Sequence, residues 1–416
     1  MERTYESAAA LVERAAGPLE PHLIVFVRSL IAQQYTASVV YIKARHAAAF
    51  DRWLAKRRVG LSDLGDLHLE RYRHRRRRRQ QWIRPESRRI EWCAVTQLFQ
   101  FFRDRGVCAT ARIETTAAEE LVANYQLHLQ DNQGLATITI ERYTTVASQF
   151  LDECFGNGAV DLRSLCANDG ISFIQRQARR MQPPALKCVV NALRSFLHYA
   201  QYRGELATAL AAAVPAVAAW ATTPALPKAI SPEHAQRAID SCNLRTGTGL
   251  RDRAVLLLLA RLGLRAHEII ALQLDDCDWD GGHLRVRSKC RREQLLPIPA
   301  DVGAAIAAYL RRGRPQSPDR HLFLRAMAPI RGLMPGSDGT GTIVRYALNR
   351  AGVNAPHRGS HQFRHALAVR MLQRGASLTE IGEVLRHQSP QTTSIYARVD
   401  IGALRPLAQP WPGGAR

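Results

Sequence analysis

The sequence is poor in acidic residues and has no long apolar run, and both shortages narrow the range of its functions. Asp and Glu number 36 against 58 Lys and Arg, which gives a formal net charge of +22. This excess of cations indicates a polyanionic partner, with nucleic acid favoured over an anionic membrane surface. The longest apolar run, residues 254–260, is far shorter than the ~20 residues of a membrane-spanning helix. We therefore expect a protein that binds nucleic acid and does not enter a membrane.

Paired cysteines, a secretion signal and nucleotide-binding loops are also missing. The eight cysteines are scattered, with no Cys-x-x-Cys pair and no two histidines at metal-ligand spacing, so neither a zinc site nor a disulfide framework is indicated. The N-terminal stretch contains acidic residues and no apolar signal core. No Walker loop or cluster of metal-binding carboxylates stands out. We expect a cytoplasmic, nucleoid-associated protein that needs no metal or nucleotide cofactor.

The sequence does contain helical periodicity from its beginning. At 416 residues, with 46% of them hydrophobic, the chain is long enough for two or three domains. Between residues 20 and 108 apolar side chains recur at intervals of three and four, as in Ile42, Phe50 and Trp53. This spacing predicts a bundle of helices.

An arginine-rich run, RYRHRRRRR, lies within this bundle at residues 71–79. Runs of like charge are usually solvated, but seven neighbouring guanidinium groups repel one another unless an anion lies alongside. We therefore predict that the end of the run contacts DNA phosphates. The residues concerned are Arg75, Arg76, Arg77, Arg78 and Arg79.

Residues 116–204 repeat the plan of the first bundle. Phe50 has a counterpart in Phe150, and LFQFFRDRG at 98–106 has one in FLHYAQYRG at 196–204. Offsets near a hundred residues predict two successive copies of one helical unit. The alternative is that two unrelated amphipathic bundles share such patterns.

The helical pattern returns after an Ala- and Pro-rich segment, which is typical of a linker. A buried helix is expected around residues 255–259, ended by Gly263. Arg265 then starts the next helix, three residues before Glu268. Without further context, this pair is a helical ion pair worth ~0.3–0.5 kcal/mol.

A β-hairpin is expected next. Residues 283–287 alternate apolar and polar side chains, and residues 294–299 can pair back with them across a turn that contains Lys289. The Leu-Phe-Leu segment that follows, within residues 321–330, is expected to pack in the core.

Residues 361–398 bring several polar side chains onto successive short helices. His361 and Arg364 are three residues apart, so a helix projects both from one face, and this pair suits a phosphate group. A Ser-x-x-Glu capping box then predicts a short helix that ends near His387. A Ser-Pro pair predicts a further helix that carries Tyr396.

These motifs resemble a known family. His-x-x-Arg, Leu-x-His and a Tyr nine residues later resemble the C-terminal signature of the tyrosine recombinases, the phage-integrase family of site-specific DNA-cutting and joining enzymes. GLRAHEIIALQLDDCDW resembles the family's first motif, with Arg265 at its arginine. Lys289 matches the family's hairpin lysine, although Ser288 and Cys290 replace the glycines on either side of it.

The resemblance implies a mainly α fold, in which helical core-binding units precede a mostly helical catalytic domain with a small antiparallel β-sheet. A single core-binding domain is usual, and the extra N-terminal copy resembles longer recombinases of mobile elements, which act in integration or transposition. The expected parts are an N-terminal helical DNA-binding domain (1–110), a core-binding domain (111–210), a linker (211–231), a catalytic domain (232–400) and a tail (401–416).

The resemblance also assigns roles that suit the chemistry of each side chain. Tyr396 is the expected nucleophile, which forms a 3′-phosphotyrosyl link that conserves the energy of the broken bond. Arg265 and Arg364 are expected to hold the two non-bridging oxygens of the phosphate without a metal or ATP.

Four further residues complete the expected site. Lys289 is the expected general acid for the leaving 5′ oxygen, because neighbouring arginines hold their protons too tightly. His361 is expected to take or shuttle the tyrosine proton, and His387 to hydrogen-bond a phosphate oxygen. Glu268 is expected to orient Arg265 or His361 from behind.

The expected partner is double-stranded DNA, bound by a homotetramer or by a mixed assembly with companion recombinases. The tail either docks on a neighbouring protomer or is a frayed end. Two alternatives remain: an enzyme that nicks and reseals DNA in the manner of type IB topoisomerases, and a non-catalytic architectural DNA-binding protein. The second would lack at least one of the six expected polar side chains, and here all six are present.

Overall fold

The structure is a computed structural model that describes most of the chain. The residues described are 4–61, 63–65, 67–72, 85–107, 116–156, 158–206, 209–218, 229–287, 293–334, 339–355 and 357–399. Lys289, the arginines at 75–79 and the tail at 401–416 therefore lie outside the described residues. None of the helices in the described ranges combines the length and the apolar character that a membrane crossing needs.

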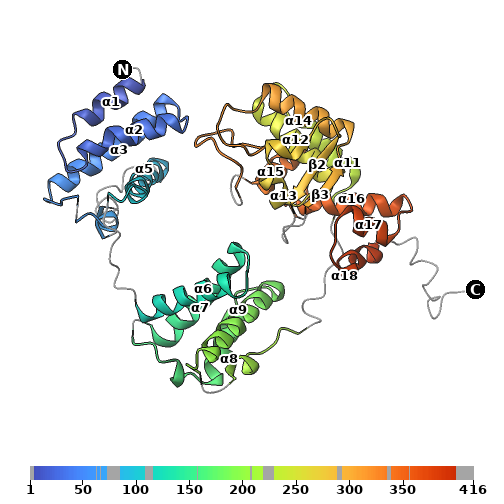
Figure 1. The fold of residues 1–416 in the computed structure, drawn as a ribbon, viewed down its shortest axis with the longest axis horizontal. Coiled ribbons are helices and arrows are strands. Elements are labelled where there is room, and N and C mark those ends of the chain that lie inside the picture. The colour runs from blue at the N-terminus through green and yellow to red at the C-terminus, as the bar shows by residue number, and fades with distance from the viewer. Residues whose placement is uncertain are drawn as a thin grey trace, which may run out of the picture. The chain divides into compact units, whose positions relative to one another are not determined.

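Contacts divide the chain into two compact units, residues 110–224 and the remainder, and the remainder contains separate hydrophobic cores. Figure 1 shows the helices of each part. The boundaries expected from the sequence, at 110, 210 and 231, stay predictions.

The N-terminal part is helical. Its elements are α1 (Tyr5–Glu13), α2 (Glu20–Ala32), α3 (Ala37–Ala55) and α5 (Pro85–Arg103). Thr4 caps α1 by accepting a hydrogen bond from the Ser7 N–H. The core between the helices is rich in aromatic rings, with Phe50 packed against Trp53 and Phe99.

Residues 116–218 form a second helical bundle. Its elements are α6 (Ala117–Asp131), α7 (Thr137–Phe155), η1 (Leu162–Ser164), α8 (Ala167–Ala178), α9 (Pro183–Tyr202) and α10 (Leu210–Ala213). A capping box between Thr116 and Glu119 starts α6. The core contains Tyr125, Phe150 and Phe196, whose rings pack edge to face.

The C-terminal part is mostly helical. Its helices are α11 (Pro232–Asp240), α12 (Gly247–Arg261), α13 (Ala266–Ala271), η3 (Leu274–Asp276), α14 (Ala300–Arg312), α15 (Thr340–Arg350), α16 (His361–Gln373), α17 (Leu378–Val384), α18 (Pro390–Thr393) and η4 (Ser394–Val399). Its strands are β1 (Cys277–Asp278), β2 (His283–Arg287) and β3 (Glu293–Pro297).

The strands form one antiparallel sheet in the order β1-β2-β3, with Leu284 opposite Leu296. The hairpin predicted from the alternating pattern of residues 283–287 is therefore confirmed, and so is the mainly α fold class with a small antiparallel sheet. The Leu-Phe-Leu segment at 322–324 is buried, as expected for core residues.

Helix α12 lies at the centre of this part, and it has buried leucines on all of its faces. Its first turn packs closely against the preceding loop, and only glycine fits at position 249. A Cβ on Gly249 would lie 2.0 Å from the Asn243 carbonyl oxygen. The helix ends before Gly263, whose φ of +56° places it in the left-handed region that glycine tolerates best. The stop predicted at Gly263 is thus confirmed.

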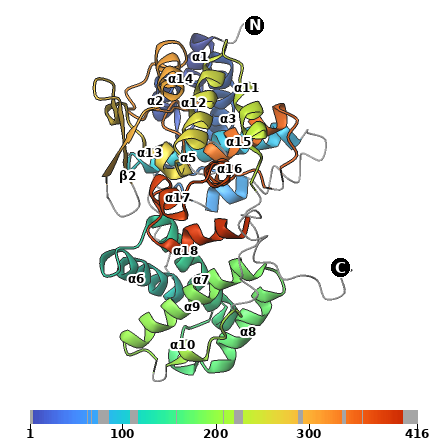
Figure 2. The same ribbon diagram turned by 90° about the vertical axis from the view of Figure 1, so that its right-hand side faces the viewer.

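The last helices pack as a small addition to this core. Figures 1 and 2 both place α17 beside α16, and α18 follows next to α17 at the red end of the chain. Five residues form a separate small core there, namely Leu367, Ala368, Ile381, Leu385 and Tyr396. Ser377 and Glu380 form the predicted capping box of α17. Tyr396 lies on η4, a 3-10 helix, rather than on the α-helix expected from the Ser-Pro pair.

Candidate active site

Arg265 lies at the start of α13, where Glu268 holds both its backbone and its side chain. The Arg265 N–H donates to Glu268 Oε2 at 2.8 Å, and Arg265 Nη1 donates to Glu268 Oε1 at 2.9 Å. Arg265 Nη2 donates to the Arg386 carbonyl oxygen at 3.2 Å. The side chain of Glu268 is only 1% exposed, whereas that of Arg265 is 27% exposed. Arg265 is therefore fixed from behind while its guanidinium remains accessible.

Arg364 lies in the first turn of α16, and its guanidinium is buried. Its two terminal nitrogens donate to the carbonyl oxygens of Gly263 and Leu385. Burial, together with the cations Arg265 and Arg386, lowers the pKa of Arg364 to about 10. Its side chain therefore stays charged at neutral pH.

Arg386 is a third guanidinium in this site, and sequence reasoning missed it. Its Nη2 donates to Glu268 Oε2 at 3.0 Å, and its side chain is only 6% exposed. Its φ is +56°, which is uncommon for a residue with a side chain. The only available signal was its position as the middle residue of Leu-x-His, because arginine is common throughout this chain.

The buried carboxylate of Glu268 contacts two guanidinium cations directly, those of Arg265 and Arg386, and the charge of Arg364 also acts on it. Burial alone would raise the pKa of Glu268, but the Arg265 N–H and the charge of Arg386 lower it below its usual value. The carboxylate is thus ionised at neutral pH and balances one of the three cations. The remaining positive charge favours an anion.

Tyr396 is 1% exposed, and its hydroxyl hydrogen-bonds to the ring of His365, with 2.8 Å between Oη and Nδ1. Burial raises the pKa of Tyr396 to about 12, opposed by the charge of Arg364. Burial, followed by His361 and Arg364, lowers the pKa of His365 to about 4. The resting pair is therefore a neutral phenol and a neutral imidazole.

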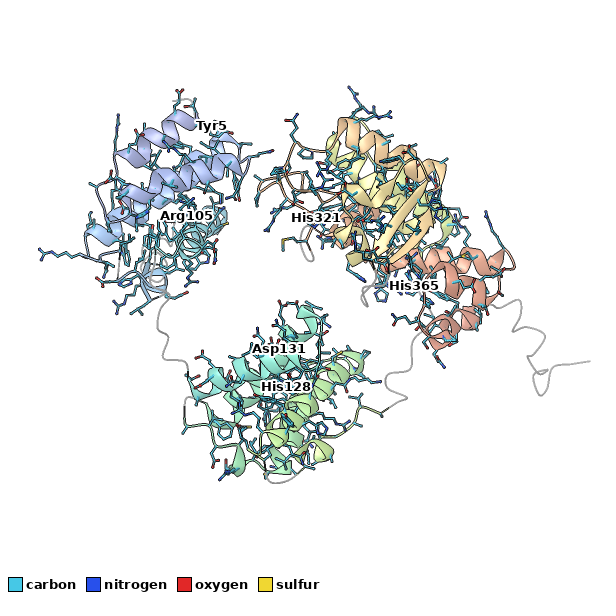
Figure 3. All side chains as sticks on the ribbon, in the orientation of Figure 1. Tyr5, Arg105, His128, Asp131, His321 and His365 are labelled. Carbon is cyan, nitrogen blue, oxygen red and sulfur yellow. The ribbon has the colours of Figure 1, made fainter. Side chains whose placement is uncertain are left out.

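His365 was also missed by sequence reasoning, although two signals pointed to it. It follows Arg364 directly, and it lies four residues after His361, so both histidines face the same side of α16. Figure 3 labels His365 among the side chains of the C-terminal part.

The two predicted histidines lie near this pair. The centroid of the His361 ring is 6.2 Å from that of His365, and burial and Arg364 lower the pKa of His361. The ring of His387 is nearly parallel to that of Tyr396, at 6° and 6.4 Å between centroids. His387 Nδ1 hydrogen-bonds to Thr393 Oγ1 at 2.7 Å, and burial, then Arg364, lowers the pKa of His387 to about 4.

The structure therefore gathers most of the predicted site. It brings together Arg265, Glu268, His361, Arg364, His387 and Tyr396. It adds His365 and Arg386, and it leaves Lys289 outside the described residues. In the described ranges, no three His, Cys, Asp or Glu side chains gather closely enough to bind a metal ion. The surplus positive charge of the site would attract an anion, and the phenol oxygen of Tyr396 could act as a nucleophile once it is uncovered.

Comparison with known proteins defines the class. Residues 228–402 match the phage integrase family, a range that includes all of the polar residues of the site. The chain is also 44% identical over 411 residues to "Putative integrase/recombinase y4rA" of Sinorhizobium fredii, a match that covers 98% of both chains. The chain belongs to the phage integrase family: it is a tyrosine recombinase, an enzyme class that transfers DNA strands in site-specific recombination.

Two further similarities, one in sequence and one in fold, are to other recombinases. The tyrosine recombinase XerA of Pyrococcus furiosus is 28% identical over 288 residues, which cover 69% of this chain and 92% of XerA. The fold is similar to that of the XerH site-specific recombinase in a post-cleavage complex with its difH substrate, with a TM-score of 0.54 and 17% identity. That match covers 69% of this chain and 83% of XerH. The architectural and topoisomerase-like alternatives are not favoured.

Proposed function

We propose that Tyr396 is the nucleophile that cuts and rejoins DNA. Its Oη would attack the scissile phosphorus, form an Oη–P bond and break the bond to the 5′ oxygen, which leaves with a proton. The product is a 3′-phosphotyrosyl link that a 5′ hydroxyl can reverse. The observation that carries this proposal is the position of the phenol beside imidazoles and Arg364, in a site with surplus positive charge.

Arg265 and Arg364 would bind the two non-bridging oxygens and stabilise the charge that develops on them. Glu268 supports this role for Arg265, because it fixes the guanidinium from the side away from solvent. For Arg364, DNA would have to replace at least part of its bonding to the carbonyl oxygens of Gly263 and Leu385. A phosphate oxygen is the stronger acceptor, since both partners of that hydrogen bond are charged.

The remaining roles follow the chemistry of the side chains. Lys289 would protonate the leaving 5′ oxygen. His387 would donate a hydrogen bond to a phosphate oxygen from the ring nitrogen that Thr393 does not occupy. His361 would take or shuttle the tyrosine proton, with His365 beside it. None of these steps requires a metal ion or ATP.

The substrate is proposed to be double-stranded DNA in the nucleoid, cut at paired sites for integration, excision or transposition. Four protomers would assemble on two sites, either as a homotetramer or with companion recombinases. The tail at 401–416 would either dock on a neighbouring protomer or remain a frayed end.

We further propose that residues 1–110 are a second copy of the core-binding unit at 111–210. Helices α3 and α7 both span 19 residues and begin a hundred residues apart. Corresponding positions are buried in both, as for Val40 with Ile140 and Phe50 with Phe150. Each unit then ends its last long helix shortly before a glycine with positive φ.

The two copies differ in charge. Residues 1–110 contain 21 Lys and Arg against 11 Asp and Glu, whereas residues 111–210 contain 9 against 10. Because phosphate neutralisation supplies most sequence-independent affinity for DNA, the first copy would provide the larger share of it. Its arginines at 75–79 are the expected contacts.

The decisive test of the proposed function is trapping of the covalent intermediate. In a DNA duplex nicked close to the scissile phosphate, the short fragment that carries the leaving 5′ hydroxyl diffuses away after cleavage. The strand cannot be rejoined, so the protein–DNA adduct accumulates. The native protein should form an adduct that withstands denaturant, and Tyr396→Phe should bind DNA equally but form none. The matched control is Tyr346→Phe, because Tyr346 is an exposed tyrosine on α15. Adduct formation by Tyr396→Phe, or binding without adduct in the native protein, would refute the proposal.

A further inference from the structure

Of the three imidazoles around Tyr396, His365 is the one hydrogen-bonded to the phenol oxygen. The ring of His387 lies parallel to the phenol ring, and its Nδ1 is bonded to Thr393. The ring of His361 lies next to that of His365, with 6.2 Å between their centroids. His361 lies one helical turn before His365 on α16, and among the described residues its ring contact is with His365 and not with Tyr396.

We propose that His365 is the general base of the cleavage step and returns the same proton when the strand is rejoined. This inference rests on the proposed function of Tyr396. As the Oη–P bond forms, the Oη–H bond breaks and its electron pair remains on oxygen, while the proton moves to Nδ1 of His365. In the reverse step the imidazolium gives this proton back as the Oη–P bond breaks.

The surroundings of His365 suit it for this role. Arg364 and His361 face it from its own helix, Tyr396 faces it from η4, and His387 lies across the phenol ring. Burial and the Arg364 cation disfavour a second positive charge, so the ring is neutral before the reaction and Nδ1 is free to accept the phenol hydrogen. The proton of the neutral ring is then on Nε2.

The same surroundings keep the nucleophile protonated until DNA arrives. Tyr396 holds its proton far more tightly than His365 does, because their pKa values are about 12 and about 4. The proton therefore remains on oxygen in the resting protein. Formation of the bond to phosphorus makes the phenol oxygen strongly acidic, and only then does transfer to His365 become favourable.

A purely structural role for His365 is the main competing explanation. His365→Asn distinguishes a structural role from a role as the general base. An asparagine amide can accept the phenol hydrogen bond near the position of Nδ1, but it cannot take up the proton. His365→Ala removes both functions. If His365 only positions Tyr396, asparagine should rescue the alanine variant. If it is the base, both variants should lose cleavage by about 10²–10⁴-fold at neutral pH.

The experiment uses the full chain and measures the single-turnover rate of adduct formation on the nicked duplex, with melting temperature and DNA affinity as controls for folding. In both His365 variants the rate should rise about tenfold per pH unit, because the phenolate fraction replaces the missing base. Added imidazole should partly restore His365→Ala. His361→Asn, on the same helix face, should lower the rate without creating this pH dependence.

A change of the leaving group provides a second, independent test of the role of His365. A duplex with sulfur in place of the scissile 5′ oxygen needs no general acid, because a thiolate leaves without a proton. This substrate should rescue Lys289→Ala and should not rescue His365→Asn. Rescue of His365→Asn by sulfur, full activity of His365→Asn, or an unchanged pH profile would overturn the inference. These results are distinct from failure of the proposed function, in which the native protein would form no adduct.

Discussion

Replacing Glu268 tests whether one carboxylate organises the arginines of the site. Glu268→Gln keeps the size of the side chain and an oxygen for the Arg265 N–H, but it removes the negative charge. The carboxylate accepts hydrogen bonds from Arg265 N at 2.8 Å, Arg265 Nη1 at 2.9 Å and Arg386 Nη2 at 3.0 Å. In Glu268→Gln, the cations Arg265 and Arg386 would repel each other in a buried site with no negative charge between them.

The size of the effect follows from burial. The side chains of Glu268 and Arg386 are 1% and 6% exposed, so their pair is shielded from water, whereas Arg265 is 27% exposed and its pair with Glu268 is partly screened. Removing one partner of a buried pair typically costs about 3–5 kcal/mol. We expect Glu268→Gln to lower the free energy of unfolding by about 3 kcal/mol, the low end, because its amide oxygen still accepts a hydrogen bond.

A double-mutant cycle separates the pair from other effects of each change. Arg386→Met alone should also be destabilising, because it leaves Glu268 with one fewer cation. The double variant should then cost at least about 1 kcal/mol less than the sum of the two single changes. Amide hydrogen exchange of α12 in the full chain is a suitable measurement, because it reports the opening of this core without requiring two-state unfolding of the whole protein.

The pH dependence provides a check on sign. The pKa of Glu268 is lower in the folded protein than in the unfolded chain, so its contribution to stability is fully present above the unfolded pKa of about 4.3. The contribution is lost as the pH falls through the lower folded pKa. The native protein and Glu268→Gln should therefore converge in stability in acid. Full additivity in the cycle, or a cost below about 1 kcal/mol at neutral pH, would refute the reasoning.

Three further predictions concern other parts of the molecule. Arg265→Ala should slow adduct formation by about 10²–10³-fold with little loss of duplex affinity, since its target is transition-state charge; equal losses in both measurements would mean that it only anchors DNA. Replacing Arg75 to Arg79 with Gln should flatten the slope of log affinity against log salt by up to about 5, and an unchanged slope would remove this run from the interface. Gly263→Ala should lower the melting temperature and the cleavage rate together, because its φ is +56° and a Cβ would lie 2.7 Å from Leu385 Cδ2, beside Arg364; a stable, active variant would contradict this.

Much of the fold was predictable because its local signals agree with its packing. Regular apolar spacing, a capping box at Ser377 and an alternating hairpin segment each predicted an element that the structure contains. The polar residues Arg265, His361, Arg364, His387 and Tyr396 were selected because their motifs combine spacing with residue type. The membership of the family is confirmed, whereas the role of each residue stays a prediction.

Arg386 and His365 were not predictable in the same way, because their importance arises from contacts between distant segments. Arg386 reaches Glu268 from 118 positions further along the chain, and a left-handed backbone directs it there. His365 acquires its role from Tyr396, 31 positions away, and nothing in the spacing of the two residues indicates a hydrogen bond. The change from α-helix to the 3-10 helix η4, which contains Tyr396, was missed because a Ser-Pro start is equally compatible with a continuing α-helix.

The burial of Tyr396 determines when the protein becomes reactive. With 1% of its surface accessible, the phenol cannot meet a phosphate on a duplex until the residues covering it give way. Tyr396 belongs with Leu367, Ala368, Ile381 and Leu385 to a small cluster that is separate from the large core around α12, so uncovering the phenol would disturb that cluster and leave the large core packed. We therefore expect a free protomer to be inactive until DNA binding uncovers the phenol.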